Sequence, residues 1–145
     1  MGGQAATAQG STSLTADIDI VYSRDRENLA LLASALAALG ASLRGTDQAV
    51  PFRLDAETLR RGLNFTFSTR FGPLDCLGEA AGAFTFEKLA PDADSYQIAG
   101  IDVPVASLED LIEMKRAAGR PKDMVEVENL AALREVREGR DRRRR

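Results

Sequence analysis

The sequence has 145 residues, of which 44% are hydrophobic and 28% are charged, and this composition is typical of one globular domain rather than a disordered or fibrous chain. One cysteine and no histidine exclude an internal disulfide, cysteine-based zinc sites, histidine-ligated metals and histidine-dependent nucleophiles. Any catalysis must therefore use carboxylates, hydroxyls, lysine and arginine, together with a hard cation held by oxygen ligands.

The first part of the chain predicts short elements separated by glycines, proline and helix-capping aspartates. We expect a short helix from Gly2-Gly3 to about Gly10, a strand IDIVY, a helix capped by Asp25 and closed by Gly40, short strands or loop over residues 41–54, and a brief helix capped by Asp55. Each of these segments is too short to form a domain alone. They must therefore pack against the rest of the chain.

The second part alternates strands and helices in the same way. We expect a strand LNFTFST, a turn over residues 70–72 into a strand PLDCLG, a helix over 86–90, a hairpin SYQIAGIDVPVAS turning at Gly100, a helix capped by Ser107 and ended by Gly119, and a last helix from Pro121 to about Val136. Together these elements predict an α/β or α+β fold, a mixed sheet flanked by helices. No linker divides it, so we expect one domain over residues 1–137.

The formal charge of −3 hides an asymmetry, because seven of the 19 basic residues lie in residues 134–145. Arginine-rich ends are more often solvated than functional. Residues 138–145 are therefore expected to form a basic, disordered tail, and RNA binding by this tail is the alternative. The chain has neither an apolar run of bilayer-spanning length nor a signal peptide, which favours a cytoplasmic protein with no membrane partner.

Acidic side chains stand in two predicted strands, where aspartate is disfavoured. In TADIDIVY, Asp17 and Asp19 are two residues apart, so they project from one face with about 7 Å between their Cα atoms, while Ile18 and Ile20 point to the core. A divalent cation would relieve the repulsion between the two carboxylates; the alternative is a half-exposed strand with a polar face. Asp75, in the apolar strand PLDCLG, favours the cation, because a lone carboxylate there is costly.

A group of basic residues follows the apolar stripe of the predicted helix LEDLIEMKRAAG. Lys115 falls on the same helix face as that stripe, so it either extends to the surface or reaches an anionic site. Arg116, Arg120 and Lys122 come soon after it, at the end of one predicted helix and the start of the next. Such a cluster suits a triphosphate or an RNA backbone.

These segments resemble the nucleotidyltransferase superfamily that includes DNA polymerase beta. The family signature is a Gly-Gly or Gly-Ser pair, a spacer, and two aspartates that alternate with hydrophobic residues; here it reads Gly2-Gly3 and then Asp17-Ile18-Asp19-Ile20. The third family carboxylate matches Asp75. With LNFTFSTRFGPLDCLGE and SLEDLIEMKRAAGRPKD, the chain is similar to small bacterial members related to AbiE-type abortive-infection toxins, over nearly its whole length to about Leu133.

The resemblance implies a metal-dependent enzyme that transfers a nucleotidyl group from an NTP to a hydroxyl of tRNA, of a protein or of a small molecule. Asp17, Asp19 and Asp75 would be catalytic and would hold Mg²⁺, or Mn²⁺ in its place. The residues implied to contact the nucleotide or the acceptor are Gly2, Gly3, Ser11, Thr12, Ser13, Lys115, Arg120 and Lys122.

The sequence departs from the family pattern at two places. In the family a β-strand precedes the Gly-Gly pair, and here only Met1 precedes Gly2, so either the start of the sequence is misplaced or trimmed, or the first core strand has been lost. Relatives often carry histidine where this chain has Gln9. The missing strand favours an alternative function: a catalytically silent binding module with the same fold, in a toxin–antitoxin or phage-defence pair with a cognate protein partner.

Overall fold

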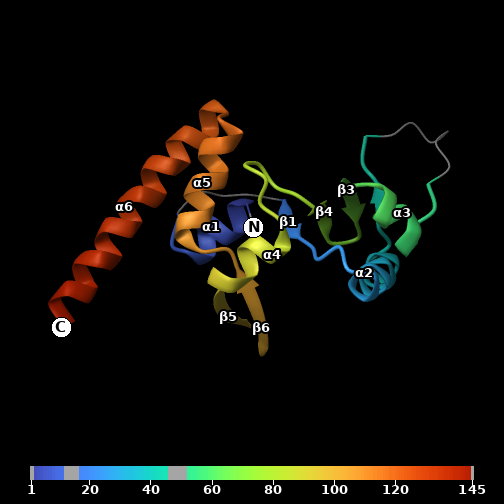
Figure 1. The fold of residues 1–145 in the computed structure, drawn as a ribbon, viewed down its shortest axis with the longest axis horizontal. Helices are drawn as coiled ribbons and strands as arrows, with labels where there is room; N and C mark the ends of the chain where they lie inside the picture. The colour runs from blue at the N-terminus through green and yellow to red at the C-terminus, as the bar shows by residue number, and fades with distance from the viewer. Residues whose placement is uncertain (1, 12–16, 46–51, 145) are drawn as a thin grey trace.

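The computed structural model describes residues 2–11, 17–45 and 52–144, and these form a mixed α and β fold (Figure 1). The helices are α1 (Gly2–Ala8), α2 (Arg26–Ala38), α3 (Ala56–Arg61), α4 (Phe86–Leu89), the 3₁₀ turn η1 (Ala90–Asp92), α5 (Leu108–Ala118) and α6 (Pro121–Arg144). The strands are β1 (Ile18–Val21), β2 (Ser42–Leu43), β3 (Asn64–Thr69), β4 (Gly72–Leu77), β5 (Asp94–Ile98) and β6 (Ile101–Val105). None of the helices in these ranges is long and apolar enough to cross a bilayer.

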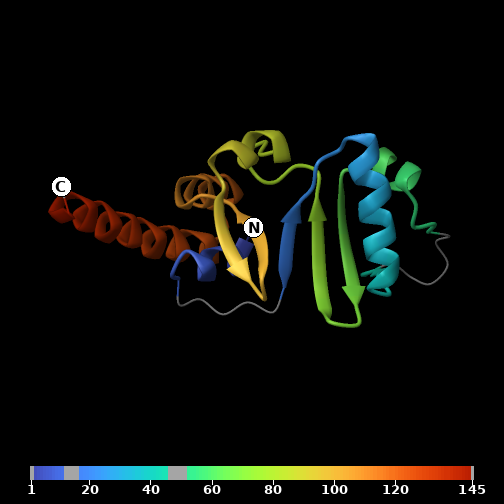
Figure 2. The ribbon, with the colours of Figure 1, turned by 90° about the horizontal axis from the view of Figure 1, so that it is seen from below.

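Four of the strands form one mixed sheet in the order β1-β4-β3-β2 (Figure 2). β3 and β4 form the predicted hairpin, with Thr69 opposite Gly72. β1 runs parallel to β4 and brings its own residues beside those of β4, although the two strands are far apart in the sequence. No strand among the described residues pairs with the other edge of β1. The hairpin β5–β6 forms a separate two-stranded sheet.

One face of the four-stranded sheet carries a hydrophobic core that α2 and α3 complete. Alternate residues of the strands point into it, including Phe67 of β3 and Cys76 of β4, both fully buried. Leu36 of α2 and Leu59 of α3 are also fully buried in this core. Because side chains alternate along a strand, the residues between them point to the opposite face.

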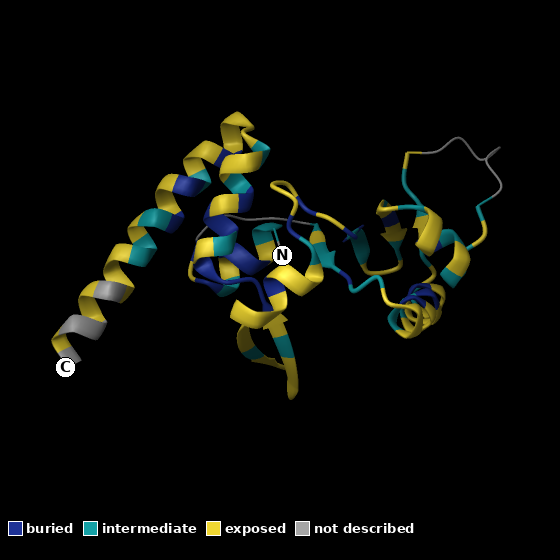
Figure 3. Cartoon of the chain, viewed as in Figure 1, coloured by how far each residue is buried: buried dark blue, intermediate teal, exposed yellow. Residues whose placement is uncertain are grey.

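A second core lies on that opposite face, at the β1 side of the sheet. It joins α1, α4, α5 and α6 with the β5–β6 hairpin, around Leu111 and Leu130. Val21 of β1 and Leu77 of β4 pack against it. In α6 the buried residues lie in the first half, and the second half is mostly exposed (Figure 3).

The predicted helix caps are confirmed by hydrogen bonds. Side-chain oxygens of Asp25, Asp55 and Ser107 accept from backbone N–H groups three residues further on, at 2.8, 2.8 and 3.1 Å. These bonds satisfy N–H groups that a helix start otherwise leaves without partners. Gly119 ends α5 with φ of +64°, the left-handed conformation that favours glycine.

Gln9 is a buried structural link between α1 and the β5–β6 hairpin. Its amide nitrogen donates to Asp94 Oδ2 at 2.6 Å and to the carbonyl of Ala106 at 3.1 Å. Its amide oxygen accepts from the Tyr96 hydroxyl at 3.0 Å. The polar side-chain atoms of Gln9 are therefore satisfied inside the protein, as buried amides require.

The structure differs from the sequence predictions at two places. Ile18, expected in the core, is 50% exposed, because it is the first residue of β1, an edge strand of the sheet. α6 continues as a helix to Arg144, whereas the sequence predicts that this helix ends near Val136. Arginine and glutamate favour helix, and Gly139 alone is too weak a breaker to end a helix already formed.

The core on the α2 side gives a stability prediction. Phe67→Ala removes a side chain with 0% exposure and should lower the free energy of unfolding by about 3–5 kcal/mol, because it leaves a cavity. The matched control is Phe71→Ala on the same hairpin, where the ring is 77% exposed. Urea denaturation measures both variants; equal losses would contradict the description of this core.

Candidate functional site

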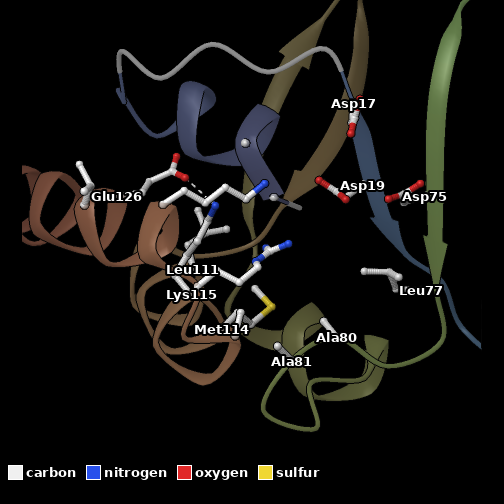
Figure 4. Close-up of a pocket in the computed structure, with 16 residues that line it drawn as sticks. Asp17, Asp19, Asp75, Leu77, Ala80, Ala81, Leu111, Met114, Lys115 and Glu126 are labelled. Atoms are coloured by element: carbon white, nitrogen blue, oxygen red, sulfur yellow. Dashed lines mark hydrogen bonds and ion pairs between the residues drawn. The ribbon is translucent and has the colours of Figure 1, made fainter. Parts of the chain in front are cut away.

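The three predicted acids line one cleft between the sheet and the α5–α6 helices (Figure 4). The parallel pairing of β1 with β4 puts Asp19 directly opposite Asp75, and Asp17 lies two residues before Asp19, at the same face. The cleft has a volume of about 520 Å³. Gly2 and Gly3, at the start of α1, form part of its wall.

The pKa of the Asp19 carboxyl is raised in the folded protein. Burial is the largest cause and raises this pKa; the positive charge of the N-terminal amino group lowers it, the charges of Asp75 and Asp17 raise it, and Lys115 lowers it. The charged form of a carboxyl group whose pKa is raised in this way is stabilised by any cation that enters the cleft. The local electrostatics therefore favour a positively charged ligand beside Asp19.

The start of α1 is pressed against Asp19. A Cβ atom added to Gly2 would stand 1.7 Å from Asp19 Oδ2, and the φ of Gly2 is +67°. Both facts exclude any other residue without a rearrangement. The glycine pair of the sequence signature thus allows the backbone of α1 to approach an acidic residue of the cleft directly.

The opposite wall of the cleft holds a buried cluster of ion pairs between α5 and α6. Lys115 Nζ lies 2.5 Å from Glu126 Oε2 and 3.5 Å from Asp123 Oδ1. Arg120 Nε donates to Asp123 Oδ2 at 2.5 Å. The Asp123 side chain has 0% exposure and that of Lys115 has 14%, so the Lys115 bonds are shielded from water, whereas the Arg120 side chain is 60% exposed.

The pKa of Asp123 reflects two opposing effects. Burial alone would raise this pKa, but hydrogen bonds from Arg120 and the positive charges of Arg120 and Lys115 outweigh it, so the pKa is lowered. Asp123 is therefore ionised at neutral pH. It stabilises the positive charge of the two cations that lie nearest to it.

Asp75 has a cationic partner on the other side of the cleft. Arg44, just after β2, donates from Nη2 to Asp75 Oδ1 at 2.6 Å. Over residues 2–11, 17–45 and 52–144, no three His, Cys, Asp or Glu side chains are grouped closely enough to form a ready-made metal site. The donor chemistry fits Mg²⁺, which prefers carboxylate oxygens, but Asp75 would have to turn from Arg44 towards Asp19.

Most of the predicted site residues come together in this cleft. Those that line it are Gly2, Gly3, Asp17, Asp19, Asp75, Lys115, Arg120 and Lys122. Ser11 does not: it is 7% exposed, buried after the end of α1, and contributes nothing to the lining of the cleft. Thr12 and Ser13 fall outside the described residues.

Three residues at the site were missed by sequence reasoning: Arg44, Asp123 and Glu126. Asp123 carried a usable signal, since it follows Arg120 by three residues in the first turn of a helix, a spacing that allows an ion pair. Arg44 carried none, because only the pairing of β2, β3 and β4 brings it to Asp75.

Cys76, the neighbour of Asp75, cannot act as a nucleophile. Burial, with a further contribution from the charge of Asp75, raises the pKa of its thiol to about 12. The reactive form of cysteine is the thiolate, and this thiol stays protonated and fully buried at neutral pH. The chemistry of the cleft therefore depends on its carboxylates and cations.

The close approach of α1 to Asp19 gives a second prediction. Gly2→Ala should impair both folding and cation binding, because its methyl group overlaps the carboxylate of Asp19. The control is Gly40→Ala: φ is +65° there, so the backbone strain is shared, but nothing lies within 4 Å of an added Cβ. Thermal unfolding and Mn²⁺ binding measure the two variants. If they behave alike, strain alone explains the effect and the overlap with Asp19 is unimportant.

The buried ion pairs give a third prediction. Asp123→Asn should lower the free energy of unfolding by roughly 1.5–3 kcal/mol at neutral pH, because it removes charged hydrogen bonds. Since the pKa of Asp123 is lowered in the folded protein, this stabilisation is complete above the ordinary aspartate pKa and is lost as the pH falls through the lowered value. Wild type and variant should therefore converge in acid.

The control for this prediction is Glu57→Gln on α3, which breaks ion pairs whose side chains are half exposed or more. Its loss should be much smaller, because water screens such pairs. Chemical denaturation at several pH values measures all three proteins. A gap between wild type and Asp123→Asn that stays constant into acid would contradict the role given to Asp123.

No protein-family model matches the chain, and no curated protein matches it either. The resemblance to nucleotidyltransferases therefore stands on the residues that carry it, chiefly Gly2-Gly3, Asp17, Asp19 and Asp75. The structure adds that these residues, distant in the sequence, line the same cleft. Function has to be inferred from the chemistry of that cleft.

Proposed function

We propose that the protein is a metal-dependent nucleotidyltransferase, which transfers NMP from an NTP to a hydroxyl group of an acceptor. The observation that carries the proposal is the arrangement of charge in the cleft. Carboxylates from β1 and β4 form one wall, and Lys115, Arg120 and Lys122 belong to the other. A triphosphate with a bound divalent cation matches both walls, because the cation meets the acids and the phosphates meet the basic residues.

Asp17, Asp19 and Asp75 are the residues that would hold Mg²⁺, or Mn²⁺ in its place. When bound, the cation neutralises phosphate charge and stabilises the attacking and leaving oxygens. The raised pKa of Asp19 and the oxygen-only donor set support this assignment. The ion pairs with Glu126 and Asp123 keep Lys115 and Arg120 at fixed positions in the cleft wall, so they contribute charge without having to reorganise.

The transfer itself needs one proton acceptor. The hydroxyl oxygen of the acceptor molecule attacks the α-phosphorus, a new O–P bond forms, and the bond from the α-phosphorus to the pyrophosphate oxygen breaks. Asp75 is the residue we assign to receive the hydroxyl proton, because a carboxylate at the edge of the cleft acts as a general base once it is free of Arg44. Pyrophosphate leaves on the side of Lys115 and Arg120.

A second candidate function is a catalytically silent module of the same fold that acts through contact with a partner protein. The observation that favours it is the missing group of three metal-binding side chains within the described residues. The two functions differ in one measurable property. The enzyme requires Asp19 and Asp75 for covalent transfer, whereas the silent module keeps its partner contact without them.

The test is incubation of the protein with Mg²⁺ and each α-labelled NTP, with tRNA, a protein mixture or small hydroxyl compounds as acceptors. We expect label in one class of acceptor, and a loss of at least about a hundredfold with Asp19→Asn or Asp75→Asn. The control is Asp92→Asn, an exposed acid on η1 outside the cleft. The proposal is refuted if no acceptor is labelled, or if the cleft variants label it as well as the control does.

A further inference from the structure

The acids of the cleft belong to a polar row that crosses the whole sheet. Asp19 of β1 lies opposite Asp75 of β4, and Asp75 lies opposite Thr66 of β3. The backbone N–H of Arg44, just beyond β2, donates to the Thr66 carbonyl at 2.9 Å. All four side chains lie on one face, because their strand neighbours point into the core on the α2 side.

Only part of this face is covered by helices. The core around α1 and α5 reaches Val21 and Leu77, at the β1 side of the sheet. Further along, the outward-pointing residues of β3 and β2 are polar and exposed: Ser42, Asn64, Thr66 and Ser68. Asp75 is therefore accessible from the β3 side as well as from the cleft.

Arg44 lies at this second approach. Its side chain is 35% exposed, and among the described residues its side-chain partner is Asp75. A guanidinium has five donors in a planar fork, so most of its hydrogen-bonding capacity is available. That fork matches the oxygens of a phosphate group better than any other cationic side chain does.

Lys115 and Asp75, the acid that holds Arg44, lie on opposite sides of Asp19. Figure 4 shows Lys115 on the α5 side and Asp75 on β4 at the other side. In phosphoryl-type transfer the attacking and leaving oxygens lie roughly in line. If pyrophosphate leaves towards Lys115 and Arg120, the attacking hydroxyl comes from the side of Asp75, and Arg44 is the cation that it meets there.

From this geometry we propose that Arg44 binds a phosphate group of the acceptor, adjacent to the hydroxyl that is modified. The inference rests on the proposed function. When a metal ion takes the charge of Asp75, the Arg44 guanidinium exchanges its carboxylate partner for that phosphate. The acceptor is therefore a phosphorylated molecule, either an RNA 3′ end or a small sugar phosphate, and a neutral protein hydroxyl is excluded.

The test measures binding rather than transfer, with three probes and Mg²⁺ present: a short RNA with a 3′ hydroxyl, ribose 5-phosphate, and a serine-containing peptide. We expect Arg44→Ala to weaken binding of a phosphorylated probe about tenfold and to reduce its salt slope by about one. Arg44→Lys should recover part of the affinity, since it keeps the charge and loses the fork. If RNA binds and ribose 5-phosphate does not, the acceptor is a nucleic acid end; the reverse identifies a small molecule.

Two further measurements distinguish a failure of the Arg44 proposal from a failure of the proposed nucleotidyltransferase function. Mn²⁺ binding without NTP, followed by electron paramagnetic resonance, should be unchanged or tighter in Arg44→Ala, because Asp75 loses a competing cation. Binding of a non-hydrolysable NTP analogue should be unchanged. Arg53→Ala, which removes an 88% exposed arginine paired with Asp55, is the control for a general loss of positive charge.

The inference is overturned by any of three results. The first is that neither phosphorylated probe binds the wild-type protein. The second is that Arg44→Ala binds both probes as the wild type does. The third is that Arg44→Ala loses Mn²⁺ and NTP affinity together with probe affinity, which would give Arg44 a structural role only. A wild-type protein that binds no Mn²⁺ and no NTP analogue would instead refute the proposed function. The two failures therefore give different results.

Discussion

The parallel pairing of β1 with β4 is the contact on which the site depends. It puts Asp19 and Asp75 at directly opposed positions on adjacent strands. Adjacent strands of a sheet are about 4.8 Å apart. Like charges at directly opposed positions destabilise a sheet; burial is the main cause of the raised pKa of Asp19, and the charge of Asp75 adds to it. The pairing persists because apolar neighbours of both acids, including Ile20 and Cys76, are fixed in the core on the α2 side.

The position of the cleft follows from the placement of two cores on opposite faces of one sheet. The first core covers all four strands from the α2 side, and the second covers the β1 side of the other face. The second core ends beside the acidic residues of β1 and β4, so these residues lie at its edge, in the cleft. An acid fully enclosed there would be neutral or would require a permanent partner, whereas at the edge it can exchange one cation for another.

The cations around the cleft are fixed by neighbouring acids. Lys115 is held by Glu126 and Asp123, Arg120 by Asp123, and Arg44 by Asp75. Ion pairs of this kind limit the conformations of long side chains and so reduce the entropy lost when a ligand binds. They also divide the site by exposure: the pairs of Lys115 with Glu126 and Asp123 are buried, whereas the side chains of Arg44 and Arg120 are 35% and 60% exposed.

The sequence by itself determined the local elements and the kind of chemistry. Capping residues and glycines set the starts and ends of α2, α3 and α5, and alternation identified the β3–β4 hairpin, because these signals act over a few neighbouring residues. The chain has no histidine, and aspartates stand in two of its predicted strands; together these two facts indicated a site built from carboxylates. The length of α6 and the exposure of Ile18 were predicted wrongly, since both depend on what packs against them. Only the tertiary structure decided that β1 lies beside β4, that Ser11 stays out of the cleft, and that Arg44 reaches Asp75, because these contacts join residues whose distance apart in the sequence carries no periodic signal.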